Sequence, residues 1–243
     1  MSPITKQQLQ FIRSLKDRKV RDENNCFVVE GLKLVQELIE QHTGLIESVF
    51  CSDPELLSND SVPVSYIKLS DLERISTQKT PNKAIAIVKK PIVETKNDNP
   101  LVLALDGIQD PGNLGTIIRT ANWFGIDQII CSKDTVDCFN SKVVQSTMGS
   151  LFRVKLDYTD LAYWLEKTDR IKYAAALSTE SNSIYQMQSN AVLVIGNEGN
   201  GISPNVLSLC DHVVTIPQFG NAESLNAAVA TGILLAEFTK QQY

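Results

Sequence analysis

Three polar, glycine-containing segments carry the residue types in this chain best suited to chemistry. They run over residues 106–115 (DGIQDPGNLG), 196–204 (GNEGNGISP) and 217–226 (PQFGNAESLN). Each follows a short apolar run typical of a strand. Glycine tolerates positive φ and lets a ligand approach the backbone closely. A single such loop is adequately explained as a turn that needs glycine, but three of them favour one shared ligand site.

Polar side chains in and beside these loops are the candidate reactive groups. Arg119 points away from the apolar side chains of its predicted helix, and a guanidinium can hold a phosphate with two hydrogen bonds. Ser224 is the expected N-cap of the last helix, which leaves Asn226 inside that helix and free for another role. Together they predict group transfer onto a hydroxyl or a phosphate-bearing substrate. The candidate catalytic residues at this point are Arg119, Glu198, Ser224 and Asn226.

Metal and disulfide chemistry find little support in the sequence. The chain has two histidines and five scattered cysteines, and no C-x-x-C pair occurs. We therefore expect no bound metal, no disulfide framework and no catalytic triad. None of the three loops is G-x-G-x-x-G or G-x-x-x-x-G-K-[ST], so a dinucleotide or nucleoside triphosphate site is weakly supported.

The order of elements after residue 100 predicts a parallel α/β sheet. Residues 101–105 (LVLAL) form an unbroken apolar run, as expected of a strand buried on both faces. Ligands bind beyond the carboxyl ends of such strands, where the three loops lie. Strands are expected at 128–131, 153–156, 172–177, 191–195 and 213–216; helices at 115–124, 141–148, after Thr159 (as cap), after Ser203 (as cap) and at 224–239.

A smaller α/β domain is expected before that sheet. The polar, proline-bracketed residues 91–100 are typical of a linker, which predicts domains at 1–95 and 96–243. In the first domain, strands are expected at 26–29, 46–51, 64–67 and 84–88, and helices at 6–19, from Leu32 to a stop near Gly44, and at 70–75.

Charge and hydropathy indicate which binding partners and which compartment to expect. Formal net charge is −5 over 243 residues, yet residues 1–21 hold six basic side chains and one acidic. This local excess fits a contact with a polyanion, but a solvated helix face is the favoured explanation from charge alone; only the family resemblance described below adds the expectation that Arg13, Arg18, Lys19 and Arg21 bind RNA. No apolar run approaches 18 residues and the N-terminus lacks a signal core. We expect a cytoplasmic protein with reduced cysteines and no membrane span.

Three segments resemble the motifs of the SpoU (TrmH-type) branch of the SPOUT RNA methyltransferases. They are DPGNLGTIIRTANWFG, VLVIGNEGNGIS and TIPQFGNAESLNAAVATGILLAEF, in the family's order and spacing, with VVQSTMGSLFRV resembling the connecting segment. The resemblance covers residues 100–243. Residues 6–90, with RKVRDENNCFVVEGLKLVQEL, are similar to the L30e-like substrate-binding domain of many members.

The resemblance implies a fold, a cofactor and a product. The fold is an α/β domain with a deep trefoil knot, which general topology rules would not predict. The enzyme is a homodimer packed through the knotted domain, and the product is a 2′-O-methylated ribose. S-adenosylmethionine is held mainly by backbone groups, and its expected contacts are Gly196, Gly201, Ile216, Gly220 and Leu225.

Family resemblance also assigns Arg119 to activation of the ribose 2′-hydroxyl. Because a guanidinium stays charged, we prefer that Arg119 binds the flanking phosphate and stabilises charge developing on the 2′-oxygen. Glu198 is then expected to position Arg119 or to accept the proton. Asn113, which the resemblance adds to the candidate catalytic residues, is expected with Asn226 to orient the ribose and the loop backbone, and Ser224 to help hold the third loop. One departure is Gln218, where the family usually has methionine after Ile216-Pro217.

Alternatives stay open at this point. One is a nucleotide-binding α/β protein that uses the glycine loops to hold phosphate. Another is a relative that binds RNA without catalysis. Within the enzyme interpretation, 23S rRNA is favoured over tRNA because the small domain resembles that of rRNA-modifying members.

Overall fold

The structure, a computed structural model, describes residues 4–57, 61–78, 80–95, 99–177, 182–183 and 187–240. Its contacts divide the chain into two compact units, which are described separately. Unit 1 is Met1–Ile92 with Phe139–Gly149, and unit 2 is Val93–Cys138 with Ser150–Tyr243. Residues 96–98 of the predicted linker lie outside the described residues. Among the described helices, none has the length and apolar character to span a membrane.

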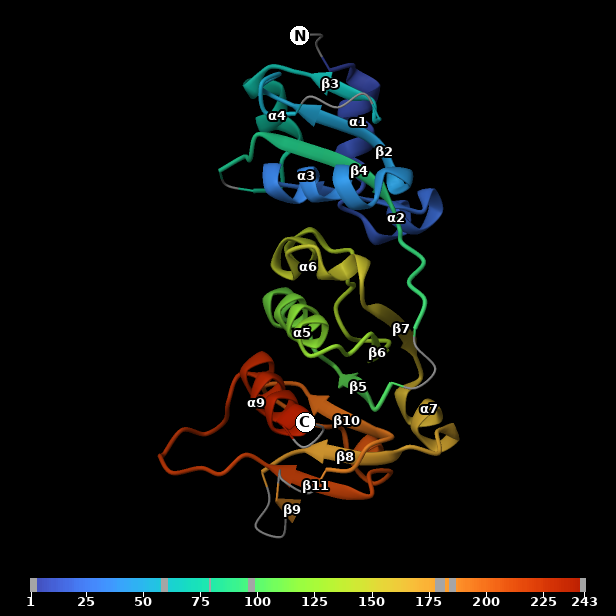
Figure 1. Cartoon of the computed structure of the whole chain (residues 1–243), viewed down its shortest axis with the longest axis vertical. Helices are drawn as coiled ribbons and strands as arrows, with labels where there is room; N and C mark the ends of the chain where they lie inside the picture. The colour runs from blue at the N-terminus through green and yellow to red at the C-terminus, as the bar shows by residue number, and fades with distance from the viewer. Residues whose placement is uncertain are drawn as a thin grey trace. The chain divides into compact units, whose positions relative to one another are not determined.

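Unit 1 is built on a four-stranded sheet in the order β1-β4-β2-β3 (Figure 1). β4 runs antiparallel to both β1 and β2, whereas β2 and β3 are parallel. The predicted strands of this part are confirmed. The elements are α1 (Lys6–Ser14), α2 (Arg18–Asn24), β1 (Cys26–Glu30), α3 (Leu32–Gln41), the 3-10 turn Thr43–Leu45, β2 (Ile46–Cys51), β3 (Val64–Tyr66), α4 (Leu69–Ile75), β4 (Ala84–Lys89) and α6 (Ser141–Thr147).

The single helix predicted over 6–19 is in fact two helices. Thr5 and Gln8 form a capping box that begins α1, which ends at Ser14. Asp17 then caps α2 by accepting a hydrogen bond of 2.8 Å from the Lys19 backbone N–H. Asn25 ends α2 in the left-handed conformation. Helical periodicity continues through this basic stretch, which is why one helix was predicted, but the cap at Asp17 divides it into two helices.

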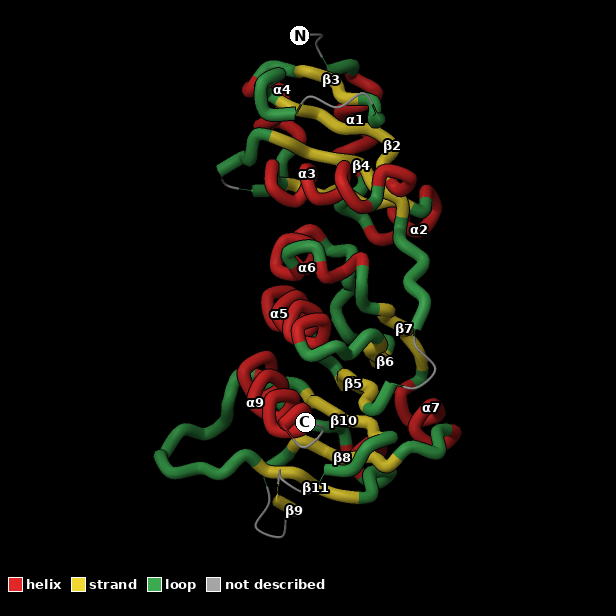
Figure 2. The backbone as a smooth tube through the Cα atoms, viewed as in Figure 1, coloured by secondary structure: helices red, strands yellow, loops and turns green. Residues whose placement is uncertain are grey.

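Unit 2 contains a seven-stranded sheet in the order β7-β6-β5-β10-β8-β11-β9, and every pair is parallel (Figures 1 and 2). The α/β class and the buried strand at 101–105 are confirmed. The elements are β5 (Leu101–Asp106), α5 (Pro111–Trp123), β6 (Gln128–Ser132), the 3-10 turn Ser150–Phe152, β7 (Lys155–Thr159), α7 (Leu161–Lys167), β8 (Ile171–Ala175), β9 (Asn182–Ser183), β10 (Ala191–Gly196), α8 (Pro204–Leu207), β11 (His212–Thr215) and α9 (Ala227–Lys240).

One apolar cluster joins α7 and α8 to the middle of this sheet. Leu161 and Leu165 of α7 and Val206 of α8 pack with inward residues of β5, β6 and β10. Helices α5 and α9 pack against each other, and α9 also contacts β10 (Figure 1). The parallel strands direct the ends of β5, β10 and β11 to one edge, where the three glycine-containing loops begin.

The bounds of α5 and β7 differ from those predicted. α5 begins at Pro111 rather than near residue 115, because Asp110 caps it and a proline is well tolerated at the first helical position. β7 covers 155–159 rather than 153–156, since a 3-10 turn occupies the chain before it. Thr159 is therefore the last strand residue, and Asp160 is the true cap of α7.

Candidate active site

Side chains from all three loops meet in one hydrogen-bonded chain. The Asn226 amide donates to the side-chain carbonyl of Asn113 at 2.8 Å. The Asn113 amide in turn donates to a carboxylate oxygen of Glu198. Three of the predicted catalytic residues are thus brought together. They come from the start of α9, the start of α5 and the loop after β10, so this chain fixes the three loops to one another.

Asn226 is also the N-cap of the last helix. Its side-chain oxygen accepts hydrogen bonds from the backbone N–H groups of Ala228 at 3.0 Å and Val229 at 3.3 Å. The prediction that Ser224 caps this helix, with Asn226 inside it, was wrong. Serine and asparagine cap equally well, and the hydrogen bonds decide between them. Ser224 is left exposed at the site, before the first helical turn.

The loop after β10 is a tight turn closed by its own backbone. Asn197 and Gly201 exchange N–H···O hydrogen bonds of 3.0 and 2.9 Å. A Cβ added at Gly196 would lie 2.3 Å from the carbonyl carbon of Gly201, so no side chain fits there. The Asn197 side chain accepts from the backbone of Gly199 and donates to the carbonyl oxygen of Gly107. Glycine at 196 is therefore a steric requirement of this turn.

Asp106, at the start of the first loop, is hydrogen-bonded to Ser203, near the end of the second loop. Its carboxylate accepts hydrogen bonds of 2.7 Å from both the backbone N–H and the hydroxyl of Ser203. Ser203 does occupy the predicted N-cap of α8, but its side chain makes no capping bond. Sequence analysis did not single out Asp106 or Asn197. A carboxylate that ends an otherwise apolar strand was the available signal for Asp106.

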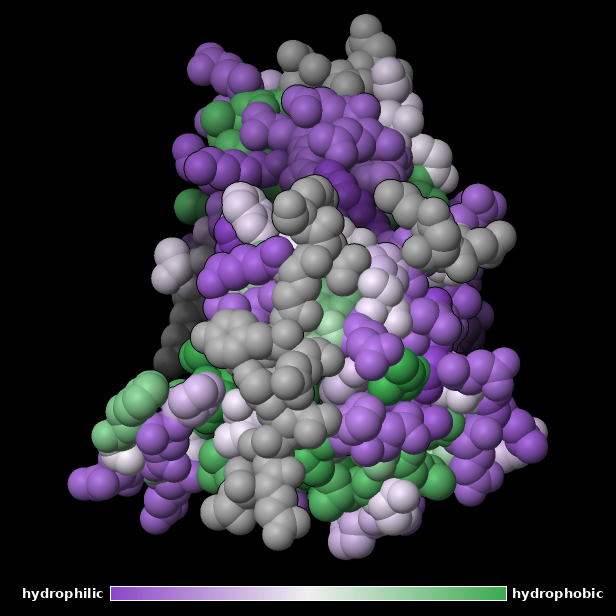
Figure 3. Space-filling model, turned by 60° about the horizontal axis from the view of Figure 1, so that its bottom comes forward, coloured by the Kyte–Doolittle hydropathy of each residue, from purple (hydrophilic) through white to green (hydrophobic). Residues whose placement is uncertain are grey.

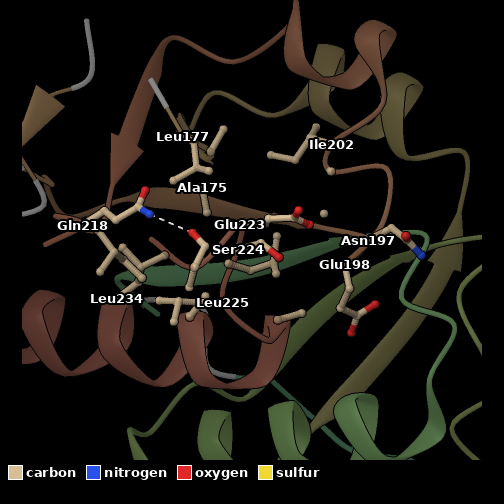
Figure 4. Close-up of a pocket in the computed structure, with 18 of the residues that line it drawn as sticks. Ala175, Leu177, Asn197, Glu198, Ile202, Gln218, Glu223, Ser224, Leu225 and Leu234 are labelled. Atoms are coloured by element: carbon tan, nitrogen blue, oxygen red, sulfur yellow. Dashed lines mark hydrogen bonds between the residues drawn. The ribbon is translucent and has the colours of Figure 1, made fainter. Parts of the chain in front are cut away.

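A cavity of about 590 Å³ opens between the loops that follow β8, β10 and β11 and the first turns of α9 (Figure 4). All five residues predicted to contact the cofactor line it, together with Glu198 and Ser224. Its apolar wall includes Leu177, Ile202 and Leu234. Among the described residues that line it, none is lysine, arginine or histidine, whereas Glu198 and Glu223 are acidic. The predicted cofactor residues are Gly196, Gly201, Ile216, Gly220 and Leu225.

Gln218 stabilises the third loop from within. Its side-chain amide donates hydrogen bonds to the backbone carbonyls of Gly220 at 2.9 Å and Ala222 at 2.7 Å. Both acceptors lie between Ile216 and Leu225, the two residues of this loop expected at the cofactor. The departure from methionine therefore adds a cross-link within the loop.

Arg119 is exposed on α5, and its guanidinium makes no hydrogen bond or ion pair with any other described residue. Glu198 does not contact it, because its carboxylate accepts a hydrogen bond from the Asn113 amide. The expectation of a Glu198–Arg119 contact was wrong for this structure. A free guanidinium on the surface of the helix is available to a phosphate from outside.

The cysteines do not contribute to this site. All five are free, and none lines the cavity. Burial raises the pKa of the Cys131 thiol well above its ordinary value, and burial with the nearby Asp211 raises the pKa of Cys210 to about 11. Such thiols stay protonated near neutral pH and are poor nucleophiles.

The basic residues predicted to bind RNA lie in unit 1 and differ in exposure. Arg13 is exposed and donates to the carbonyl oxygen of Arg74, while Arg18 and Lys19 form ion pairs along α2 with Asp22 and Glu23. Arg21 is only 4% exposed, and its guanidinium donates to the carbonyls of Leu15 and Lys16. Arg21 therefore stabilises the turn between α1 and α2. The prediction that it contacts an RNA phosphate was wrong, because its guanidinium is buried.

A parallel sheet with a cavity beyond its strand ends, in which no described lining residue is lysine, arginine or histidine, is typical of an α/β protein that binds a small molecule. Residues 100–236 match the SpoU rRNA Methylase family, and residues 6–86 match the MRM3-like substrate binding domain. The chain belongs to the SpoU rRNA methylase family and is an RNA methyltransferase that uses S-adenosylmethionine. The predicted family is confirmed, and the nucleotide-binding alternative is wrong.

Individual relatives span almost the whole chain. The 23S rRNA (guanosine(2553)-2′-O)-methyltransferase RlmP of Bacillus subtilis is 32% identical over 237 residues, covering 94% of each protein. A TrmH-family structure from Porphyromonas gingivalis is 36% identical with a TM-score of 0.86, covering 99% of this chain and 100% of that one. An AdoMet-bound rRNA methyltransferase from Sinorhizobium meliloti is 29% identical with a TM-score of 0.83, covering 100% and 98%.

Proposed function

We propose that this enzyme transfers the methyl group of S-adenosylmethionine to the 2′-oxygen of a ribose in 23S rRNA. The observation that carries the proposal is a partly acidic cavity, with no lysine, arginine or histidine among its described lining residues, between the second and third loops, which hydrogen bonds through Asn113 tie to the first. The B. subtilis relative is named for 2′-O-methylation of a guanosine in that RNA. tRNA is the competing substrate.

The residues around the cavity fit the cofactor. An adenosine needs apolar surface and backbone hydrogen-bonding groups, which Leu177, Ile202 and the glycine-rich turns supply. We assign cofactor contact to Gly196, Ile216 and Leu225, supported by Gly201 and Gly220. The bound cofactor supplies an electrophilic methyl group, so the protein chiefly supplies alignment and electrostatic stabilisation.

Arg119 is the proposed catalytic residue on the RNA side. Its exposed guanidinium binds the phosphate next to the target ribose and stabilises negative charge that develops on the 2′-oxygen. Asn113, Glu198 and Asn226 position the loops through their hydrogen-bonded chain, and Ser224 contacts the substrate from the third loop.

RNA selection is assigned to residues 1–95, which we propose as the substrate-binding domain, with residues 96–243 as the methyltransferase domain. The exposed Arg13, Arg18 and Lys19 would contact phosphates and make binding depend on salt. The match of residues 6–86 to a substrate binding domain supports this division of labour.

We also propose that the enzyme is a homodimer and that its methyltransferase domain contains a trefoil knot. Large apolar side chains are exposed on α5 and α9, where Trp123 is 83%, Val229 51% and Ile233 36% exposed. Figure 3 shows one face of the molecule, with hydrophobic side chains gathered among hydrophilic ones in the lower part of the view. Exposed apolar patches of this kind mark interaction surfaces.

We propose the cytoplasm as the compartment, where rRNA is modified and free cysteines stay reduced.

The test is methyl transfer from labelled S-adenosylmethionine to separate pools of unmodified 23S rRNA and tRNA, with the digested nucleosides identified. We expect label on a ribose of 23S rRNA. Label on tRNA alone would replace the substrate, and cofactor binding without transfer to either pool would contradict catalysis.

A further inference from the structure

The cavity contains one carboxylate that the structure leaves without a partner. Glu198 accepts a hydrogen bond from Asn113, whereas Glu223 makes no hydrogen bond or ion pair with any described residue. Figure 4 shows the Glu223 side chain directed into the cavity, on the side facing Ile202. With no lysine, arginine or histidine among the described lining residues, nothing in the cavity wall neutralises this charge.

The fold gives Glu223 no structural task. The residue is exposed and lies in the loop before α9, where neither a cap nor an ion pair depends on it. Its backbone position is nevertheless defined, because the adjacent Ala222 carbonyl accepts a hydrogen bond of 2.7 Å from Gln218. A carboxylate held over an apolar cavity without a partner favours a positively charged ligand.

Methyl transfer changes the charge of the molecule proposed to occupy this cavity. The bond between the sulfonium sulfur and its methyl carbon breaks with both electrons left on sulfur. A new bond joins that carbon to the ribose 2′-oxygen, which loses its proton to solvent. S-adenosylmethionine therefore becomes S-adenosylhomocysteine, and the ligand loses one positive charge.

We infer that Glu223 is a specificity-determining residue that makes the cavity bind the sulfonium form of the cofactor more tightly than the neutral product. This rests on the proposed position of the cofactor in the cavity. The consequence is directional: the carboxylate strengthens binding of the reactant and, because it adds little for the thioether, lets the product leave. Two unit charges several ångströms apart in a partly solvated site correspond to about a threefold to tenfold change in affinity.

The experiment compares binding of S-adenosylmethionine and S-adenosylhomocysteine by calorimetry to the full chain and to Glu223→Gln. Glutamine keeps the shape and removes the charge. We expect the variant to bind S-adenosylmethionine about threefold to tenfold more weakly and S-adenosylhomocysteine within twofold of wild type. Comparing the ratio of the two affinities between Glu223→Gln and wild type cancels the contribution of the methyl group itself. Glu166→Gln, an exposed position on α7 outside the cavity, is the matched control and should leave both affinities unchanged.

A second measurement uses the wild-type protein alone. The preference for S-adenosylmethionine should shrink as salt is raised from 50 to 500 mM, because ions screen an exposed carboxylate. In Glu223→Gln the preference should depend less on salt than in wild type, because Glu198 is then the one carboxylate left among the described lining residues.

The outcomes separate the two proposals. Equal weakening of both ligands in Glu223→Gln, or an unchanged ratio, overturns the role of Glu223 while leaving the cofactor site intact. Wild-type protein that binds neither ligand overturns the proposed site and this inference with it.

Discussion

The side-chain amide of Asn226 donates a hydrogen bond of 2.8 Å to the side-chain carbonyl of Asn113, a residue 113 positions earlier in the chain. Because Asn226 uses its own oxygen to cap α9, and Asn113 uses its amide to bind Glu198, the donors all point in one direction. The chain ends on a carboxylate, which only accepts. Each asparagine is thus required as an amide, with both a donor and an acceptor.

Asn113→Asp should disrupt this chain without changing its shape. Aspartate cannot donate to Glu198, and it places a second carboxylate against the first. Loss of a hydrogen bond to a charged group predicts about a tenfold or greater fall in the rate of methyl transfer. The measurement is single-turnover transfer to rRNA. Asn205→Asp, at an exposed position on α8, is the control, and equal activity of the two variants would refute the assignment.

Gln218→Met should weaken cofactor binding by loosening the third loop. Methionine has nearly the same length but lacks both donors to Gly220 and Ala222. Two hydrogen bonds in an exposed loop predict about a fivefold rise in the dissociation constant for S-adenosylmethionine. Gln218→Glu, which sets a charge against two carbonyls, should be worse. An unchanged dissociation constant in both variants would show that the cross-link does not shape the site.

Gly196→Ala should destabilise the methyltransferase domain. The added methyl group would overlap the backbone of Gly201, so the turn must move, at a cost of about 1–3 kcal/mol in the free energy of unfolding. Thermal and urea melts measure this. At Gly220 an added Cβ meets nothing within 4 Å, so Gly220→Ala is the control and should melt like wild type.

Substitutions of Arg21 and Lys19 should have different effects: the first should change stability and the second should change RNA binding. Arg21→Ala removes a buried guanidinium and its bonds to Leu15 and Lys16, so it should lower the free energy of unfolding. Lys19→Ala, on the exposed face of α2, should leave stability unchanged, weaken RNA binding and reduce the salt dependence of binding by about one counterion. The reverse pattern would refute the assignment of the RNA surface.

The meeting of the three loops could be predicted because parallel strands end at one edge of a sheet. The apolar run at 101–105 predicted the interior strand β5, because a strand buried on both faces is apolar throughout. The bonds between the loops could not be predicted, since Asn113 and Glu198 are 85 residues apart and nothing local links them. Arg21 was misjudged because arginine is rarely buried, and only its contacts with Leu15 and Lys16 show otherwise.

The most direct test of the account is Arg119→Ala, assayed for cofactor binding and for ribose methylation of 23S rRNA on the same preparation. We predict an unchanged dissociation constant for S-adenosylmethionine, because Arg119 does not line the cavity, together with loss of detectable 2′-O-methyl nucleoside by mass spectrometry. Methylation at a rate close to that of wild type would contradict the proposed mechanism.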